Sequence, residues 1–97
     1  MSLRINENDL ELVGFDGGGS GMYHYQGKPF TGIMLIYNEK ENYLYIEREF
    51  QNGYEEGQFR SYHKNGKVRQ EYRSHNNITV EGSYKRWDEN GNLVESF

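Results

Sequence analysis

Three histidines are the side chains of this chain best suited to acid-base or metal chemistry. His24, His63 and His75 are spread along the sequence, and none has a second histidine or a carboxylate at a spacing typical of metal ligands. The chain has no cysteine, which excludes a thiolate metal site, a cysteine nucleophile and a disulfide framework. We therefore expect no metal site, no catalytic residue and no enzyme activity.

The segment Asp16-Gly17-Gly18-Gly19-Ser20-Gly21 is the glycine cluster that could cradle a phosphate or present a nucleophile. It lacks the Gly-Lys-Ser/Thr ending of a phosphate loop, and its serine lacks the surroundings of a nucleophile elbow. We therefore expect no cofactor. This much glycine instead predicts a flexible connector or a loose turn.

Aromatic side chains fit a binding role better than a catalytic one. Tyr62 and Trp87 lie near arginines and lysines in the sequence, and Tyr, Trp and Arg dominate the energetics of protein interfaces. Tyr62 and Trp87 are therefore predicted contact residues. The alternative is that Tyr37, Tyr62 and Trp87, which occupy equivalent positions, stack on one another as a structural ladder.

A repeat must position these side chains. Gly32, Gly57 and Gly82 follow one another at intervals of 25 residues, and aromatic residues recur at fixed distances after them. Absence of alanine excludes a helical bundle. The repeat predicts an all-β, elongated antiparallel sheet of successive hairpins in a single domain, 1–97. We place an irregular N-terminal cap at 1–31 and hairpin repeats at 32–56, 57–81 and 82–97.

The dipeptides Asn65-Gly66 and Asn90-Gly91 predict the turns of the second and third hairpins. A two-residue turn sets Phe59 against Tyr72, Arg60 against Glu71 and Tyr62 against Arg69. In the third hairpin the same register sets Tyr84 against Phe97 and Trp87 against Val94. A bulged turn would shift each register by one residue. Within the cap, residues 9–13 and 22–25 could pair as a leading hairpin.

Two sequence patterns resemble a known family. The stretch Gly27-Lys28-Pro29-Phe30-Thr31-Gly32 precedes copies of Gly-x-aromatic-x-x-aromatic-x-x-Asn-Gly-x-aliphatic. Over residues 22–97 this resembles the MORN-repeat variant of bacterial YwqK-type antitoxins. The resemblance implies a sheet of successive hairpins and a binding protein without chemistry of its own. Family members that are paired with toxins act as immunity proteins, which bind and block a toxin domain.

Charge is unevenly distributed along the chain. Residues 1–57 hold ten acids and four bases, a balance of −6, whereas residues 58–97 hold five acids and seven bases, a balance of +2. On the antitoxin interpretation, the acidic first part complements a basic, nucleic-acid-attacking toxin. The predicted acidic contacts are Asp16, Glu39, Glu41, Glu55 and Glu56. For the four glutamates the alternatives are a paired-carboxylate site, which requires the fold to bring them together, and solvated turn acids.

Other kinds of partner differ in how well they fit the sequence. A structural repeat protein that forms a homodimer through open sheet edges is the alternative function. Basic residues near Tyr62 and Trp87 are compatible with nucleic acid, but the net charge of −4 disfavours it. No apolar run approaches the length of a membrane span, and there is no polybasic patch for lipid headgroups. We expect a cytoplasmic protein with a protein partner.

Overall fold

Strands form most of the regular structure in the computed structural model, which describes residues 3–97. Their bounds are β1 (Arg4–Asn6), β2 (Glu11–Phe15), β3 (Gly21–Tyr25), β4 (Lys28–Pro29), β5 (Gly32–Asn38), β6 (Tyr43–Gln51), β7 (Tyr54–Tyr62), β8 (Val68–His75), β9 (Ile78–Thr79), β10 (Lys85–Trp87) and β11 (Leu93–Ser96). A 3₁₀ helix, η1, spans Glu7–Asp9. Within the described residues, no helix is long and apolar enough to cross a membrane.

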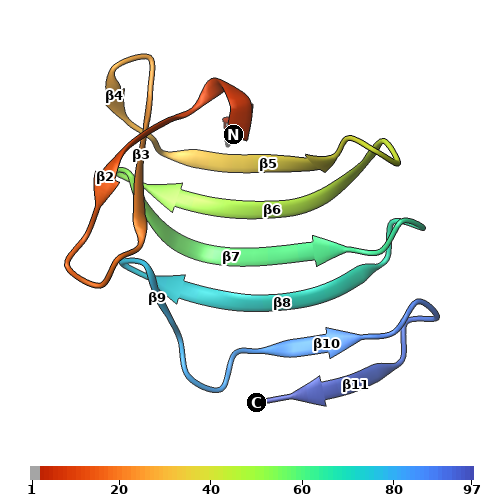
Figure 1. Ribbon diagram of the computed structural model, residues 1–97. Helices are drawn as coiled ribbons and strands as arrows, with labels where there is room; N and C mark the ends of the chain where they lie inside the picture. The colour runs from red at the N-terminus through yellow and green to blue at the C-terminus, as the bar shows by residue number, and fades with distance from the viewer. Residues whose placement is uncertain (1–2) are drawn as a thin grey trace.

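The larger sheet has eight strands in the order β1-β5-β6-β7-β8-β10-β11, with β9 also paired to β8 (Figure 1). From β5 onward each strand is antiparallel to its neighbour. The predicted all-β class and sheet of successive hairpins are confirmed. One difference is that β1 pairs in parallel with β5, which makes the sheet mixed. The radius of gyration is 13.9 Å, larger than the value of about 12.5 Å for a compact domain of this length. The molecule is therefore elongated, as predicted.

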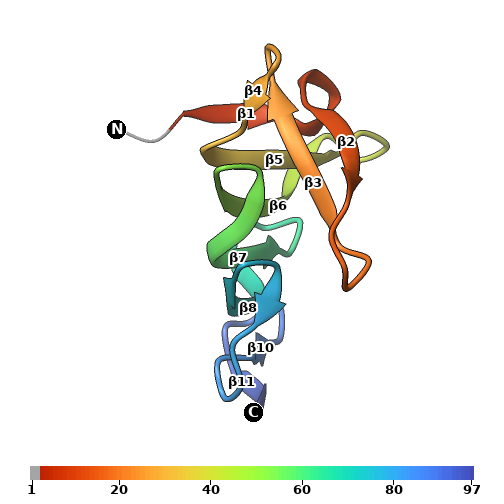
Figure 2. The same ribbon diagram turned by 90° about the vertical axis from the view of Figure 1, so that its left-hand side faces the viewer.

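A smaller antiparallel sheet, β2-β3-β4, lies against one face of the larger sheet (Figure 2). The leading hairpin is confirmed, because β2 pairs with β3. The hydrophobic core lies between the two sheets, with Phe30, Met34 and Phe50 buried at its centre. Tyr23 packs edge-on against Phe50. The cap therefore supplies the second layer that a single sheet needs to bury an apolar face.

Tight two-residue turns close the hairpins at one end of the larger sheet. At Asn52-Gly53 and Asn76-Asn77 both central residues have positive φ, as type I′ turns require. We call this the turn end. The tip of the β2–β3 hairpin contacts it, since Asn77 Nδ2 donates to Asp16 Oδ2 over 3.0 Å.

Longer loops at 39–42, 63–67 and 88–92 close the opposite end, which we call the loop end (Figure 1). In the second hairpin Gly66 N donates to His63 O, and His63 N donates to Lys67 O. In the third hairpin Gly91 N likewise donates to Asp88 O, and Asp88 N donates to Asn92 O. In both loops only the glycine has positive φ, +88° at each position, so each is a type I turn followed by a bulged glycine.

The glycine cluster of the cap forms the same kind of loop. Gly19 N donates to Asp16 O, Asp16 N donates to Ser20 O, and Gly19 has a φ of +87°. The Asp16 carboxylate also accepts from Gly18 N at 2.9 Å and from Ser20 N at 3.0 Å. Of the two predicted alternatives, a flexible connector or a loose turn, the structure has the turn, and backbone and side-chain hydrogen bonds define it.

The loops also decide the register. The pairs Phe59–Tyr72 and Arg60–Glu71 are confirmed, but Tyr62 pairs with Val68 instead of Arg69. Trp87 likewise pairs with Leu93 and not with Val94, so these two predicted pairs are wrong. In each hairpin the five-residue loop begins one residue earlier in the first strand than a two-residue turn would. The returning strand therefore has one extra residue, which forms a bulge.

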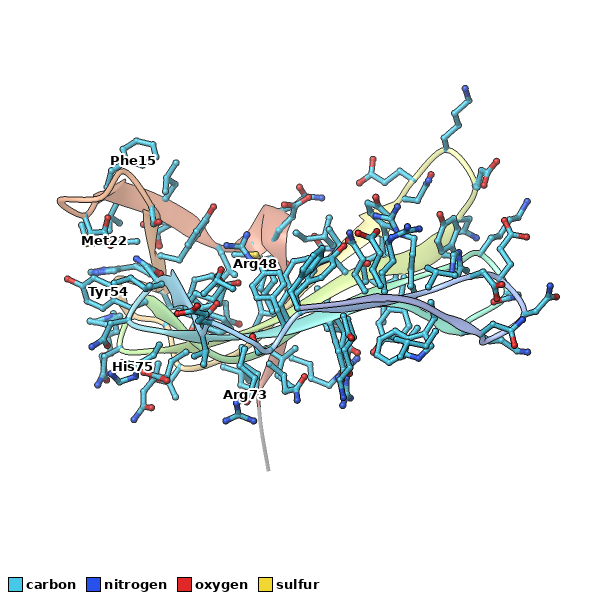
Figure 3. All side chains as sticks on the ribbon, turned by 90° about the horizontal axis from the view of Figure 1, so that it is seen from below. Phe15, Met22, Arg48, Tyr54, Arg73 and His75 are labelled. Carbon is cyan, nitrogen blue, oxygen red and sulfur yellow. The ribbon has the colours of Figure 1, made fainter. Side chains whose placement is uncertain are left out.

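The two faces of the larger sheet differ in their surroundings. Phe59 stacks on Tyr72 with ring centroids 4.3 Å apart, and Tyr84 packs on Phe97 at 5.5 Å. Arg48, which is paired with Phe59, lies on the side covered by the hairpin that carries Phe15 (Figure 3). Arg73 projects from the opposite face of the sheet, which the cap does not cover (Figure 3). The aromatic row therefore lies on the face that the cap partly covers.

Candidate functional site

Bulges at equivalent positions bring Tyr45 and Arg69 together near the loop end. In the β5–β6 pair the register passes from Ile36–Ile46 to Tyr37–Leu44, which leaves Tyr45 as the extra residue. In the β7–β8 pair Arg69 is the extra residue in the same way. The Arg69 guanidinium lies over the Tyr45 ring, 5.2 Å from its centroid, and Nη2 donates to Tyr45 Oη at 2.7 Å. Bulges re-aim side chains, and here they produce a cation–π pair between two hairpins.

This pair lines a groove of about 700 Å³ at the loop end. Tyr43, Tyr62 and His63 also line it, and the Tyr43 ring packs edge-on against Tyr45 with centroids 6.2 Å apart. Charged side chains that share the lining are Glu41, Lys64 and Glu89. Lys64 Nζ lies 3.9 Å from Glu41 Oε2. The groove thus combines aromatic walls with opposite charges.

The Tyr62 side chain is held by contacts with neighbouring strands of the larger sheet. Its hydroxyl donates to the Glu47 carboxylate, and Glu47 also pairs with Arg4, Nη1 to Oε2, at 2.6 Å. Burial, followed by the hydrogen bond to Glu47, raises the pKa of Tyr62 to about 12. The phenol therefore stays protonated near neutral pH and can donate its hydrogen bond to Glu47.

His63 joins the second hairpin to the third. Its Nε2 lies 2.9 Å from the Trp87 backbone oxygen, and a carbonyl oxygen only accepts, so Nε2 carries a proton. Asn65 Nδ2 makes a parallel link to Glu89 O at 2.9 Å. Within residues 3–97, no group of three or more His, Asp or Glu side chains could hold a metal ion. The geometry here suits recognition by shape, charge and hydrogen bonds.

The predicted acidic contacts fall into two groups. Glu41 lines the groove, and Glu39 lies in the same loop, where its Oε1 accepts from Asn8 Nδ2 at 3.4 Å. Asp16, Glu55 and Glu56 lie instead at the turn end. The structure therefore does not bring the five acids into one surface.

Glu55 is the most deeply placed of these acids, with 7% of its surface exposed. Its Oε2 lies 2.8 Å from Arg48 Nε, and its Oε1 accepts from Ser74 Oγ at 3.1 Å. Its neighbour Glu56 pairs with His75 Nδ1 at 2.8 Å. Asp16 accepts from Asn77, and this hydrogen bond, together with the Ser20 backbone N–H, lowers the pKa of Asp16 below its ordinary value.

The two predicted aromatic contacts are both near the loop end. Tyr62 lines the groove, and Trp87 lines a neighbouring hollow that shares His63 and Arg69 with it. Tyr37, Tyr62 and Trp87 form no ring pair with one another in the described part of the chain. The ladder interpretation is therefore wrong, because β6 and β8 lie between the strands that carry these side chains.

Sequence reasoning missed Tyr43, Tyr45 and Arg69 as groove residues. Tyr45 and Arg69 are separated by 24 residues, close to the repeat interval, so their equivalence was visible in principle. The sequence did not show that both are bulge residues, because a bulge depends on the geometry with which each loop closes. No family model matches the chain, and no curated protein or solved structure matches it.

Proposed function

We propose that this chain is a non-catalytic binding module of the antitoxin or immunity type, which holds a partner protein at the loop-end groove and blocks it. The observation that carries the proposal is the groove itself, where three tyrosines and a stacked arginine line an open hollow. Tyr and Arg are the residue types that supply most binding energy at protein interfaces. We further propose that the protein acts in the cytoplasm, needs no cofactor and does not bind a membrane.

The charge pattern supports a protein partner over nucleic acid. Arg60 Nε lies 3.3 Å from Glu71 Oε2, and Arg86 Nε lies 2.5 Å from Glu95 Oε1. Of the four cations near Tyr62 and Trp87, Arg60 and Arg86 are already paired with carboxylates, whereas Arg69 and Lys85 are not paired within the described part of the chain. Two unpaired cations are few for contacts to a chain of phosphates.

The proposal is tested by co-expression with the product of the adjacent gene, which should be toxic alone and harmless with this chain. Tyr43→Ala removes a wall of the groove and should weaken the complex about tenfold or more. Tyr54→Ala is the matched control, because Tyr54 lies at the turn end and is 37% exposed. A neighbour that is neither toxic nor bound contradicts the proposal, as does equal weakening by both variants.

Self-association is a second candidate, because β11 is an outer strand with exposed apolar side chains. Leu93 is 55% exposed and Val94 is 44% exposed, and an unpaired strand edge is a template for another strand. A scaffolding role predicts a dimer whose mass, measured by light scattering, falls to that of one chain in Leu93→Lys. A wild-type chain that is monomeric at high concentration contradicts this role.

A further inference from the structure

Arg69 differs from the other arginines of the sheet in its partners. Arg4, Arg48, Arg60 and Arg86 each have a carboxylate oxygen within 3.3 Å. Among the described residues, Arg69 and Arg73 have no such ion pair. Arg73 is exposed to water, whereas Arg69 is half-buried, so the missing carboxylate is physically significant only at Arg69.

The hydrogen-bond partners of Arg69 are neutral. Nη2 donates to Tyr45 Oη at 2.7 Å and approaches Gln70 Oε1 at 3.5 Å. Nε is shielded from solvent and has no acceptor. A partly buried guanidinium without a counter-charge carries a desolvation cost. The fold accepts this cost at a position that lines the groove.

We propose that Arg69 is the anchor of a carboxylate-binding subsite, which receives an Asp or Glu side chain of the partner protein. This inference rests on the proposed function and names the chemistry that the partner presents. The partner's carboxylate supplies the charge that the chain does not, and the Tyr43 and Tyr45 rings flank its aliphatic stem. A guanidinium that is already stacked on an aromatic ring is preorganised for such a bond.

The charges at the rim favour one carboxylate over a phosphate group. Glu41 and Glu89 line the same groove, and Glu41 is only weakly countered by Lys64 at 3.9 Å. A dianionic phosphate would meet both acids, whereas a single carboxylate matches the single uncompensated charge of Arg69. The same rim acids would attract a basic surface that surrounds the partner's acidic anchor.

The direct test is an NMR titration of ¹⁵N-labelled wild-type protein, following the Arg69 Nε–H signal. The probes are blocked aspartate (N-acetyl-aspartate amide), the neutral blocked asparagine and inorganic phosphate. We expect saturable shifts at Arg69 with blocked aspartate, no saturable shift with blocked asparagine, and weaker binding of phosphate. Equal responses to aspartate and asparagine overturn the subsite, and tighter binding of phosphate overturns its assignment to a carboxylate side chain.

Variants separate this inference from the proposed function. Arg69→Lys keeps the charge but loses the planar fork and the stacking, so it should weaken blocked aspartate and the adjacent-gene product about tenfold or more. Arg73→Lys is the matched control and should change neither. If Tyr43→Ala weakens the protein complex and Arg69→Lys does not, the subsite is wrong and the proposed function stands. If blocked aspartate binds at Arg69 but the neighbour's product does not bind, the proposed function fails.

Discussion

Glu55 provides the sharpest test of how the turn end is held together. Its carboxylate bridges β6 and β8, with Arg48 Nε at 2.8 Å and Ser74 Oγ at 3.1 Å. Its backbone N–H donates to Asn77 Oδ1 at 2.6 Å, and Asn77 in turn holds Asp16 of the hairpin tip. Because 7% of Glu55 is exposed, these contacts are largely removed from water.

Glu55→Ala should lower the free energy of unfolding by about 3 kcal/mol, the low end of the range for a broken buried ion pair. The low end applies because the Arg48 side chain is 28% exposed and reaches water once its partner is gone. Glu55→Gln keeps the shape and most hydrogen bonds but not the charge, so about 1–2 kcal/mol should be lost.

Urea unfolding of Arg48→Ala, Glu55→Ala and the double variant Arg48→Ala/Glu55→Ala measures the coupling, which we expect at about 1.5–3 kcal/mol. A loss below about 0.5 kcal/mol in Glu55→Ala, the value of an exposed pair, would refute the reasoning. The same variants bear on the prediction of Glu55 as a partner contact. That prediction requires Glu55→Gln to weaken binding of the partner to the folded protein, in addition to lowering the free energy of unfolding.

Three further outcomes follow from the loops and the shifted pKa values. Gly66→Ala should destabilise by about 1–2 kcal/mol in thermal unfolding because φ is positive there, whereas Gly17→Ala, in open space without positive φ, should not. Asp16→Asn removes a carboxylate whose pKa is lowered by Asn77. The variant should therefore have a lower free energy of unfolding than wild type at pH values above the ordinary pKa of Asp. This difference should shrink as the pH falls through the lowered pKa of the folded state, and a difference that does not change with pH refutes this. Ultraviolet titration should show one phenol with a pKa of about 12 that is absent in Tyr62→Phe; an unchanged titration contradicts the assignment.

The hairpin repeat was predictable from the spacing of glycines, aromatic residues and Asn-Gly dipeptides, but the turn types were not. Asn52-Gly53 and Asn65-Gly66 are the same dipeptide, yet Asn52 has positive φ and Asn65 does not. Tertiary contacts make the difference. Gly53 exchanges backbone hydrogen bonds with Phe30 and Tyr23, which holds a tight turn against the cap.

At the loop end the same dipeptide meets different neighbours. Asn65 Oδ1 accepts from Lys67 N within its own loop, and Nδ2 donates to Glu89 O in the next. Side-chain hydrogen bonds of this kind compete with the tight turn. The resulting bulge placed Arg69 in the groove, so the candidate site could be predicted only in part: Tyr62 and Glu41 were identified and Arg69 was not.

Contacts with the cap account for the position of the groove at one end of the sheet. The turn end is tied to the cap through Gly53–Tyr23 and Asn77–Asp16, and the core lies between the sheets on that side (Figures 2 and 3). The loop end is held chiefly by bonds between successive hairpins, such as His63 to Trp87 O. A hairpin that is fixed at one end and joined to its neighbours at the other can adjust its loops without unfolding its core. A partner at the groove would then order the part of the molecule with the least tertiary support, so backbone hydrogen exchange in 63–67 and 88–92 should slow on binding more than at Asn52 and Asn76.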